Sequence, residues 1–139
     1  CWKESPAGPA ALRAGFRIER GGCDLFNIRL SKCGGIINSL KLAAMAHRAG
    51  LDYQLGCQVG ETGILSAAGR HFATSVGNIR YLEGSYDRYL VKEPLTEDDL
   101  TFHRGGRAAA LTGEGLGVQI NQDALKRVTV SEDHWNIGS

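Results

Sequence analysis

Cationic residues and glycines follow one short apolar segment in an order that suits the binding of an anionic group. Arg29 lies at the end of segment 25–30, Lys32 follows in the turn, and Gly34-Gly35 stands at the start of a predicted helix. Guanidinium and ammonium groups, with amides left free at a helix start, are typical ligands of carboxylates and phosphates. A structural strand-to-helix turn with surface cations would have the same sequence, so both interpretations stay open here.

A thiol and two carboxylates stand where two later apolar segments end. Cys57 closes segment 52–57 and Glu61 follows it, and Glu83 closes segment 79–83. Singly, each carboxylate is typical of a helix start or a solvated surface, and Cys57 of a small apolar residue. Because the carboxyl ends of parallel strands meet at one edge of a sheet, the set together favours an active-site face.

Two strand–helix units and a third strand must position these residues. Alternation of Phe26, Ile28 and Leu30 with polar residues predicts a first strand whose apolar face is buried. The strands start about 27 residues apart, the length of one βα unit, which favours parallel pairing in a βαβαβ pattern. The other predicted elements are helix 36–49 with an apolar stripe that includes Ile36 and Ile37, strand 52–57, helix 61–76 and strand 79–83.

The predicted α/β fold divides the chain into three parts. Residues 1–22 are an irregular lead-in with a possible helix over 10–20, residues 23–85 a partial parallel barrel, and residues 86–139 an extended C-terminal segment. Three parallel strands leave two open edges, which predicts a larger sheet or barrel, or pairing with a second copy. The C-terminal segment is predicted to hold extended stretches at 100–103, 108–111 and 118–120, and a short helix over 121–127.

Composition excludes several partners. The 139 residues carry a formal net charge of +1, which provides no electrostatic basis for binding nucleic acid or an anionic membrane. No apolar run approaches the roughly 18 residues that a membrane-spanning helix needs. We therefore expect a cytoplasmic protein with reduced cysteines that acts on a small molecule.

The run from Asn27 to Ile36 resembles the sixth barrel strand and following turn of the enolase superfamily, in its muconate-lactonizing-enzyme and mandelate-racemase type. Segments 56–61, 80–83 and 113–118 are similar, in the same order, to that family's seventh and eighth strand ends and its C-terminal glycine-rich loop. The resemblance implies the last strands of a TIM barrel with the segment that returns to the capping domain. It also implies an isomerase, muconate cycloisomerase-like, that abstracts a proton next to a carboxylate and stabilises the enolate on Mg²⁺.

The resemblance implies roles for six residues and raises two conflicts. Arg29 stands where the family has its acid/base lysine, and arginine is a poor base, although it suits a carboxylate or enolate. Lys3-Glu4-Ser5 falls near the position of a metal-ligand strand, but lysine does not ligate Mg²⁺. No metal ligand is therefore assigned in this chain. The expected catalytic residues are Arg29, Lys32 and Glu83, and the expected substrate contacts are Asn27, Cys57 and Glu61.

Without a base and a metal site, we expect this chain to be inactive alone. Its expected partners are a small carboxylate-containing substrate and either further copies of itself or a chain that completes the barrel. Two alternatives stay open. One is a non-catalytic, self-associating α/β protein derived from the same fold. The other is an anion-binding module built on residues 32–35.

Overall fold

The computed structural model describes residues 10–134, and it places three parallel strands and several helices there. In chain order, the elements are α1 (Ala10–Glu19), β1 (Leu25–Ile28), α2 (Leu30–Cys33), α3 (Ile36–Arg48), β2 (Asp52–Leu55), α4 (Gly63–Ser75), β3 (Ile79–Leu82), α5 (Asp87–Leu90) and α6 (Gln122–Val128). The predicted helix over 10–20 is confirmed as α1. The rest of the lead-in, including Lys3-Glu4-Ser5, lies outside the described residues.

The strands pair in the order β1-β2-β3, which confirms the predicted α/β fold and its βαβαβ pattern. Ile28 lies opposite Leu55, and Leu55 lies opposite Leu82. One residue earlier in each strand, Asn27 lies opposite Gln54, so these two residues form the neighbouring row across the sheet. Successive rows face opposite sides of the sheet, so apolar and polar rows alternate.

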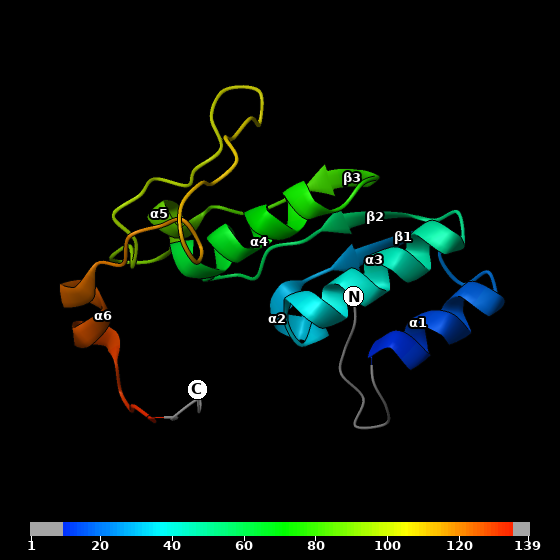
Figure 1. Ribbon diagram of the computed structural model, residues 1–139, viewed down its shortest axis with the longest axis horizontal. Coiled ribbons are helices and arrows are strands. Elements are labelled where there is room, and N and C mark those ends of the chain that lie inside the picture. Colours follow the sequence, from blue (N-terminus) through cyan, green and yellow to red (C-terminus); the bar gives the residue numbers. More distant parts are fainter. Residues whose placement is uncertain (1–9, 135–139) are drawn as a thin grey trace.

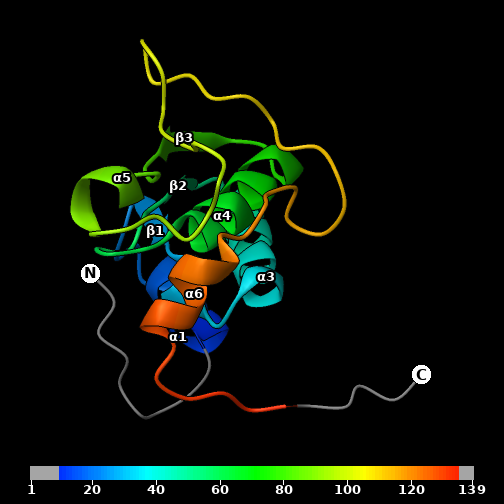
Figure 2. The same cartoon turned by 90° about the vertical axis from the view of Figure 1, so that its left-hand side faces the viewer.

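One face of the sheet packs against α3 and α4, which lie side by side on it (Figures 1 and 2). Phe26, Ile28, Tyr53 and Leu55 point to this face and form the core with residues of both helices. Helix α1 packs on the outside of α3, and Ala14 of α1 belongs to the same core. Helices α1, α3 and α4 therefore cover one side, whereas Asn27 on the other side is exposed in the described part of the chain.

The first strand is shorter than the alternation predicted. Leu30 is buried as expected, but it begins the short helix α2 instead of ending β1. The turn forms because the amides of Lys32 and Cys33 both donate to the carbonyl of Arg29. Apolar periodicity could not reveal this turn, because Leu30 reaches the same core from either conformation.

The predicted apolar stripe of α3 is wrong at its start. The exposed fractions of Ile36 and Ile37 are 38% and 67%. The residues that α3 buries are Ser39, Leu42, Ala43 and Ala46. Small side chains let the helix approach the sheet closely, and Ser39 satisfies its hydroxyl by donating to the carbonyl of Gly35 at 2.9 Å. Ile36 and Ile37 face away, whereas Leu42 packs at the contact beside the small residues.

The segment from residue 84 to 120, called the return segment below, lies at the end of the molecule toward which the strand arrows point (Figure 1). The strand predicted at 118–120 is wrong, and the extended stretches at 100–103 and 108–111 do not form strands. The structure has only isolated bridges there, between Thr96 and Ile120 and between His103 and Arg107. The short helix that follows is confirmed as α6. No helix in the described part of the chain is long and apolar enough to cross a membrane.

Candidate active-site pocket

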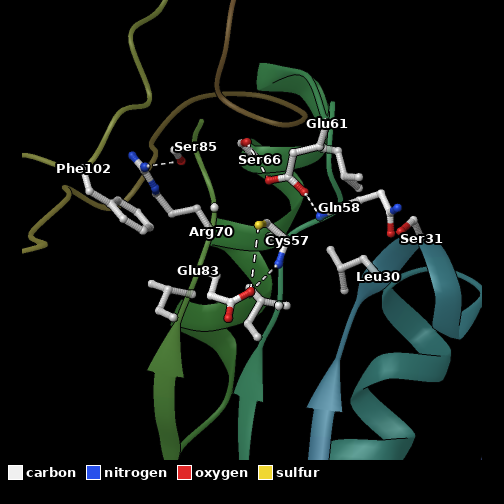
Figure 3. Close-up of a pocket in the computed structure, with 16 residues that line it drawn as sticks. Leu30, Ser31, Cys57, Gln58, Glu61, Ser66, Arg70, Glu83, Ser85 and Phe102 are labelled. Atoms are coloured by element: carbon white, nitrogen blue, oxygen red, sulfur yellow. Dashed lines mark hydrogen bonds between the residues drawn. The ribbon is translucent and has the colours of Figure 1, made fainter. Parts of the chain in front are cut away.

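A pocket opens at the carboxyl ends of the three strands, between them and the start of α4 (Figure 3). Strand ends, α4 and the return segment each supply part of its wall. The side chains that carry polar groups there are Ser31, Cys57, Gln58, Glu61, Ser66, Arg70, Glu83 and Ser85, and the apolar ones are Leu30, Leu55, Leu65, Leu82 and Phe102. The predicted residues Cys57, Glu61 and Glu83 therefore share one pocket.

Glu83 is tied to the neighbouring strand β2 and to the residue just beyond it. Gln54 Nε2 donates to Oε1 of Glu83 at 3.3 Å. The backbone amide of Cys57 donates to Oε2 at 3.4 Å, and the Cys57 thiol lies 3.9 Å from the same oxygen. The carboxylate is thereby held against a potential proton donor at the pocket floor.

Glu61 is held by residues at the start of α4. Its Oε2 accepts from the amide of Gln58 at 2.8 Å, and its Oε1 accepts from the Ser66 hydroxyl at 3.0 Å. Both oxygens thus have partners from the loop and helix that they join. This geometry gives Glu61 a structural role at the helix start in addition to its place in the pocket wall.

The electrostatics of the pocket keep the Cys57 thiol protonated. Burial is the largest cause that raises its pKa, and the negative charges of Glu61 and Glu83 raise it further. The positive charge of Arg29 acts in the opposite direction and does not overcome them. A protonated thiol is a proton donor and a weak nucleophile, so the site does not favour thiolate chemistry.

Asn27 and Arg29 lie beside the pocket and do not line it. They flank Gly56, where an added Cβ would lie 2.1 Å from Asn27 Oδ1 and 3.1 Å from Arg29 Cγ. The Nε of Arg29 is buried and, among residues 10–134, has no hydrogen-bond partner. A buried donor without an acceptor is costly, and a ligand oxygen would satisfy it.

Lys32 and the glycines after it do not join the pocket. The expectation of free amides at Gly34 and Gly35 is wrong, because both donate to the carbonyl of Leu30. They close the C-terminal end of α2, where Gly34 and Gly35 have φ values of 84° and 90° that favour glycine. The anion-binding alternative loses its backbone donors.

Sequence reasoning missed Arg70, Ser85 and Phe102. Arg70 is a buried residue of α4, and its guanidinium points toward the return segment (Figure 3). Burial lowers the pKa of this guanidinium. No sequence pattern marked these residues, because an arginine within a helix is ordinarily solvated, and the other two belong to a segment without periodicity.

The described residues do not fit a magnesium ion. No three histidine, cysteine, aspartate or glutamate side chains among residues 10–134 converge on a point where a metal would bind. The two pocket carboxylates are engaged by other partners, Glu61 by Gln58 and Ser66 and Glu83 by Gln54 and Cys57. Mg²⁺ requires near-octahedral oxygen ligands, and these two carboxylates alone do not provide them.

The fold and the pocket define a class of protein, namely an α/β unit with ionisable residues at the carboxyl ends of parallel strands. The family model described as "Enolase C-terminal domain-like" matches residues 10–124. The chain belongs to the enolase superfamily. The expected family is therefore confirmed, and its relatives include racemases, epimerases and cycloisomerases.

Three relatives illustrate the likeness. The chain is 37% identical over 119 residues to N-succinyl-L-Arg/Lys racemase of Bacillus cereus, covering 84% of this chain and 30% of the racemase. The crystal structure of that racemase matches with a TM-score of 0.75 and 31% identity, covering 91% of this chain and 33% of the other. Muconate cycloisomerase 1 of Rhodococcus opacus is 32% identical over 110 residues, which are 79% of this chain and 29% of the cycloisomerase.

The third relative has a metal in its structure. A dipeptide epimerase from Cytophaga hutchinsonii, complexed with Mg and the dipeptide D-Ala-L-Val, matches with a TM-score of 0.75 and 25% identity. The match covers 84% of this chain and 31% of the epimerase. The chain thus spans about a third of the length of the relatives that it matches.

Proposed function

We propose that this chain forms one wall of the active site of an isomerase that moves a proton next to the carboxylate of a small substrate. The observation that carries the proposal is the unpartnered, buried Nε of Arg29 beside a pocket at the strand ends. Membership of a family that contains racemases, epimerases and cycloisomerases supports the same chemistry. Within that family, our more specific proposal remains a muconate cycloisomerase-like reaction.

In this proposal Arg29 binds the substrate carboxylate and offsets the charge that develops on its oxygens, whereas Lys32, which does not line the pocket, contributes only its positive charge nearby. A guanidinium stays charged at any ordinary pH and presents several donors to an oxyanion. Such fixed donors lower the barrier because they are already oriented when negative charge forms. Arg29 does not abstract the proton, because it does not deprotonate in this range.

In this proposal Glu83 and Cys57, at the pocket floor, act on the proton next to the substrate carboxylate. Glu83 takes up the proton from the substrate carbon and returns it, while the Cys57 thiol stays protonated and donates a hydrogen bond to the Glu83 carboxylate. Asn27 and Glu61 complete the contacts, Asn27 by its amide and Glu61 by fixing the loop over the site.

The remaining requirements come from outside the described residues. Mg²⁺ is present in the structures of related dipeptide epimerases, and when bound it would stabilise an enolate. We propose that segments beyond residues 10–134, or another chain, supply its ligands together with the strands that complete the barrel. The 139-residue chain alone should be inactive.

A chimera tests this proposal directly. In it, the chain replaces the matching third of the Bacillus cereus racemase, and deuterium uptake next to the carboxylate is followed in D₂O with Mg²⁺. The substrates are N-succinyl amino acids, dipeptides and muconate. We expect no exchange from the chain alone and slow exchange from the chimera. Arg29→Lys, which restores a base, should accelerate the chimera by about a hundredfold.

Arg29→Ala in the chimera is the matched control, because it removes the guanidinium without adding a base. It should raise the KM for the carboxylate and leave exchange slow. Exchange by the 139-residue chain alone would contradict the proposed division of the site. A folded Arg29→Lys chimera without exchange on any substrate would refute the proposed chemistry.

A non-catalytic, self-associating protein is the second candidate. Two open strand edges favour it, together with the exposed apolar residues Tyr81 and Leu82 on β3. In that case the pocket residues would serve structure alone. The chimera would then show no exchange, and the chain alone would form a defined oligomer.

A further inference from the structure

A buried arginine, Arg70, is part of one wall of the pocket, and the proposed chemistry does not use it. The exposed fraction of Arg70 is 9%. Among residues 10–134, no carboxylate lies within ion-pair distance of its guanidinium. Burying a cation without a counter-ion is unfavourable unless its donors are well satisfied. The hydrogen-bond partners of Arg70 therefore indicate its structural role.

All of these partners belong to the return segment. Nη2 of Arg70 donates to the Ser85 hydroxyl at 3.3 Å and to the carbonyl of Leu100. Nη1 donates to the carbonyl of Ala109 at 3.4 Å. One side chain of α4 therefore fixes three separate stretches of a segment that has no strand or long helix of its own.

The same guanidinium also contacts the ring of Phe102, which lines the pocket. Its Cζ lies 5.6 Å from the centroid of the Phe102 ring, within the range of a cation–π contact. Phe102 and Arg70 both line the pocket, with Phe102 on the side of the return segment (Figure 3). The remaining apolar lining comes from Leu30, Leu55, Leu65 and Leu82.

We infer that Phe102 limits the size of the apolar side chain that the pocket admits, and that Arg70 is the positioning residue that holds Phe102 in place. This inference rests on the proposed function, since it assigns the specificity wall of that pocket. The ligand class is a small carboxylate with an apolar side chain, because leucines and a phenylalanine surround the space beside the polar floor.

A thiol-labelling experiment tests the wall without requiring activity. In the full 139-residue chain, Cys1, Cys23 and Cys33 are replaced by serine, which leaves Cys57 as the probe in the pocket. Alkylation rates are measured with iodoacetamide, which is small, and with fluorescein maleimide, which is bulky. Phe102→Ala should accelerate the bulky reagent about tenfold and the small one less than about twofold.

Arg70→Met should produce the same selective acceleration, although the mutation leaves Phe102 in the chain. Arg70→Lys, which keeps the charge but not the set of donors, should lie between Arg70→Met and the parent. Arg104→Met is the matched control, because Arg104 is an exposed arginine of the same segment, and it should change neither rate. If Arg70→Met does not fold, the Phe102→Ala and Arg70→Lys results decide.

Parallel acceleration of both reagents in Phe102→Ala would mean general loosening and would overturn the inference, as would no change in either rate. In the chimera, Phe102→Ala should raise kcat/KM for carboxylates with larger apolar side chains, chiefly through a lower KM. A parent chimera without activity would refute the proposed function, and the labelling result would still decide the role of Phe102.

Discussion

At the residue scale, Gly56 is the position where the site leaves least room. A Cβ there would lie 2.1 Å from Asn27 Oδ1, so Gly56→Ala must displace Asn27 and Arg29 or shift the strand. Because Asn27 Oδ1 is the end of an exposed side chain that can turn aside, we expect the free energy of unfolding to fall by about 1 kcal/mol, the low end of the cost of overpacking. Urea denaturation measures this change.

Gly77→Ala is the control, because no atom lies within 4 Å of a Cβ built at Gly77. It should change the free energy of unfolding by less than about 0.5 kcal/mol. Equal losses in the two variants would contradict the close packing of Gly56 against Asn27.

The Cys57 thiol provides a pH-dependent prediction. Glu83→Gln removes a charge that raises the thiol pKa, so the midpoint of the alkylation rate against pH should move down. Arg29→Ala removes a charge that lowers the pKa, and the midpoint should move up. Glu132→Gln, at an exposed position far along the chain, should move nothing. Midpoints that do not respond to either pocket charge would contradict the described electrostatics.

The same shift affects stability in a defined direction. Because the pKa of Cys57 is raised in the folded state, the unfolded thiol ionises first as the pH increases. The contribution of this group to stability is complete below the pKa of the unfolded thiol and decreases as the pH rises above it. Unfolding midpoints of the parent and Cys57→Ser across alkaline pH measure the difference.

The sequence predicted the polar residues at the strand ends more fully than the residues of α4 and the return segment that line the same pocket. Cys57, Glu61 and Glu83 share a pocket because each follows a strand of a parallel sheet, and strand ends are readable from periodicity. Their roles remain predictions. Arg70 and Phe102 were unpredictable, since the burial of an arginine depends on carbonyl acceptors that lie 30 and 39 residues away in sequence.

At the element scale, α6 depends on its cap. The side chain of Asn121 accepts a hydrogen bond from the amide of Ala124 at 2.8 Å. Asn121→Ala should destabilise this seven-residue helix by about 1 kcal/mol and accelerate hydrogen exchange of its amides. Gln122→Ala, at an exposed position inside the helix, should not. Unchanged exchange in Asn121→Ala would show that packing alone holds α6.

Element types were predictable where the apolar period was clear, and the faces of the helices were not. α3 and α4 begin and end within two residues of their predicted bounds. Ile36 and Ile37 nonetheless face away from the sheet, because the close approach of α3 selects serine and alanine at the contact. The strand predicted at 118–120 is wrong, because the backbone of the return segment is satisfied by isolated bridges, turns and α4 side chains.

At the scale of the whole molecule, the open sheet predicts self-association. The β3 edge carries Tyr81 with an exposed fraction of 58% and an unpaired row of backbone groups. Light scattering on a size-exclusion column should give a mass above that of one chain, and Tyr81→Lys should lower it. Ile37→Lys, at an exposed position on α3, is the control and should not. A monomeric parent would contradict this expectation.

The attachment of the return segment also has a consequence for the order of folding. Arg70 bonds to Ala109 across 39 residues, and His71 Nε2 contacts the carbonyl of Leu116 at 2.9 Å across 45. Contacts between sequence neighbours form before such distant ones, because closing a longer loop costs more entropy. The strands and their two helices can therefore assemble first. The pocket would be completed last, when the return segment packs on α4 and brings Phe102 into its wall.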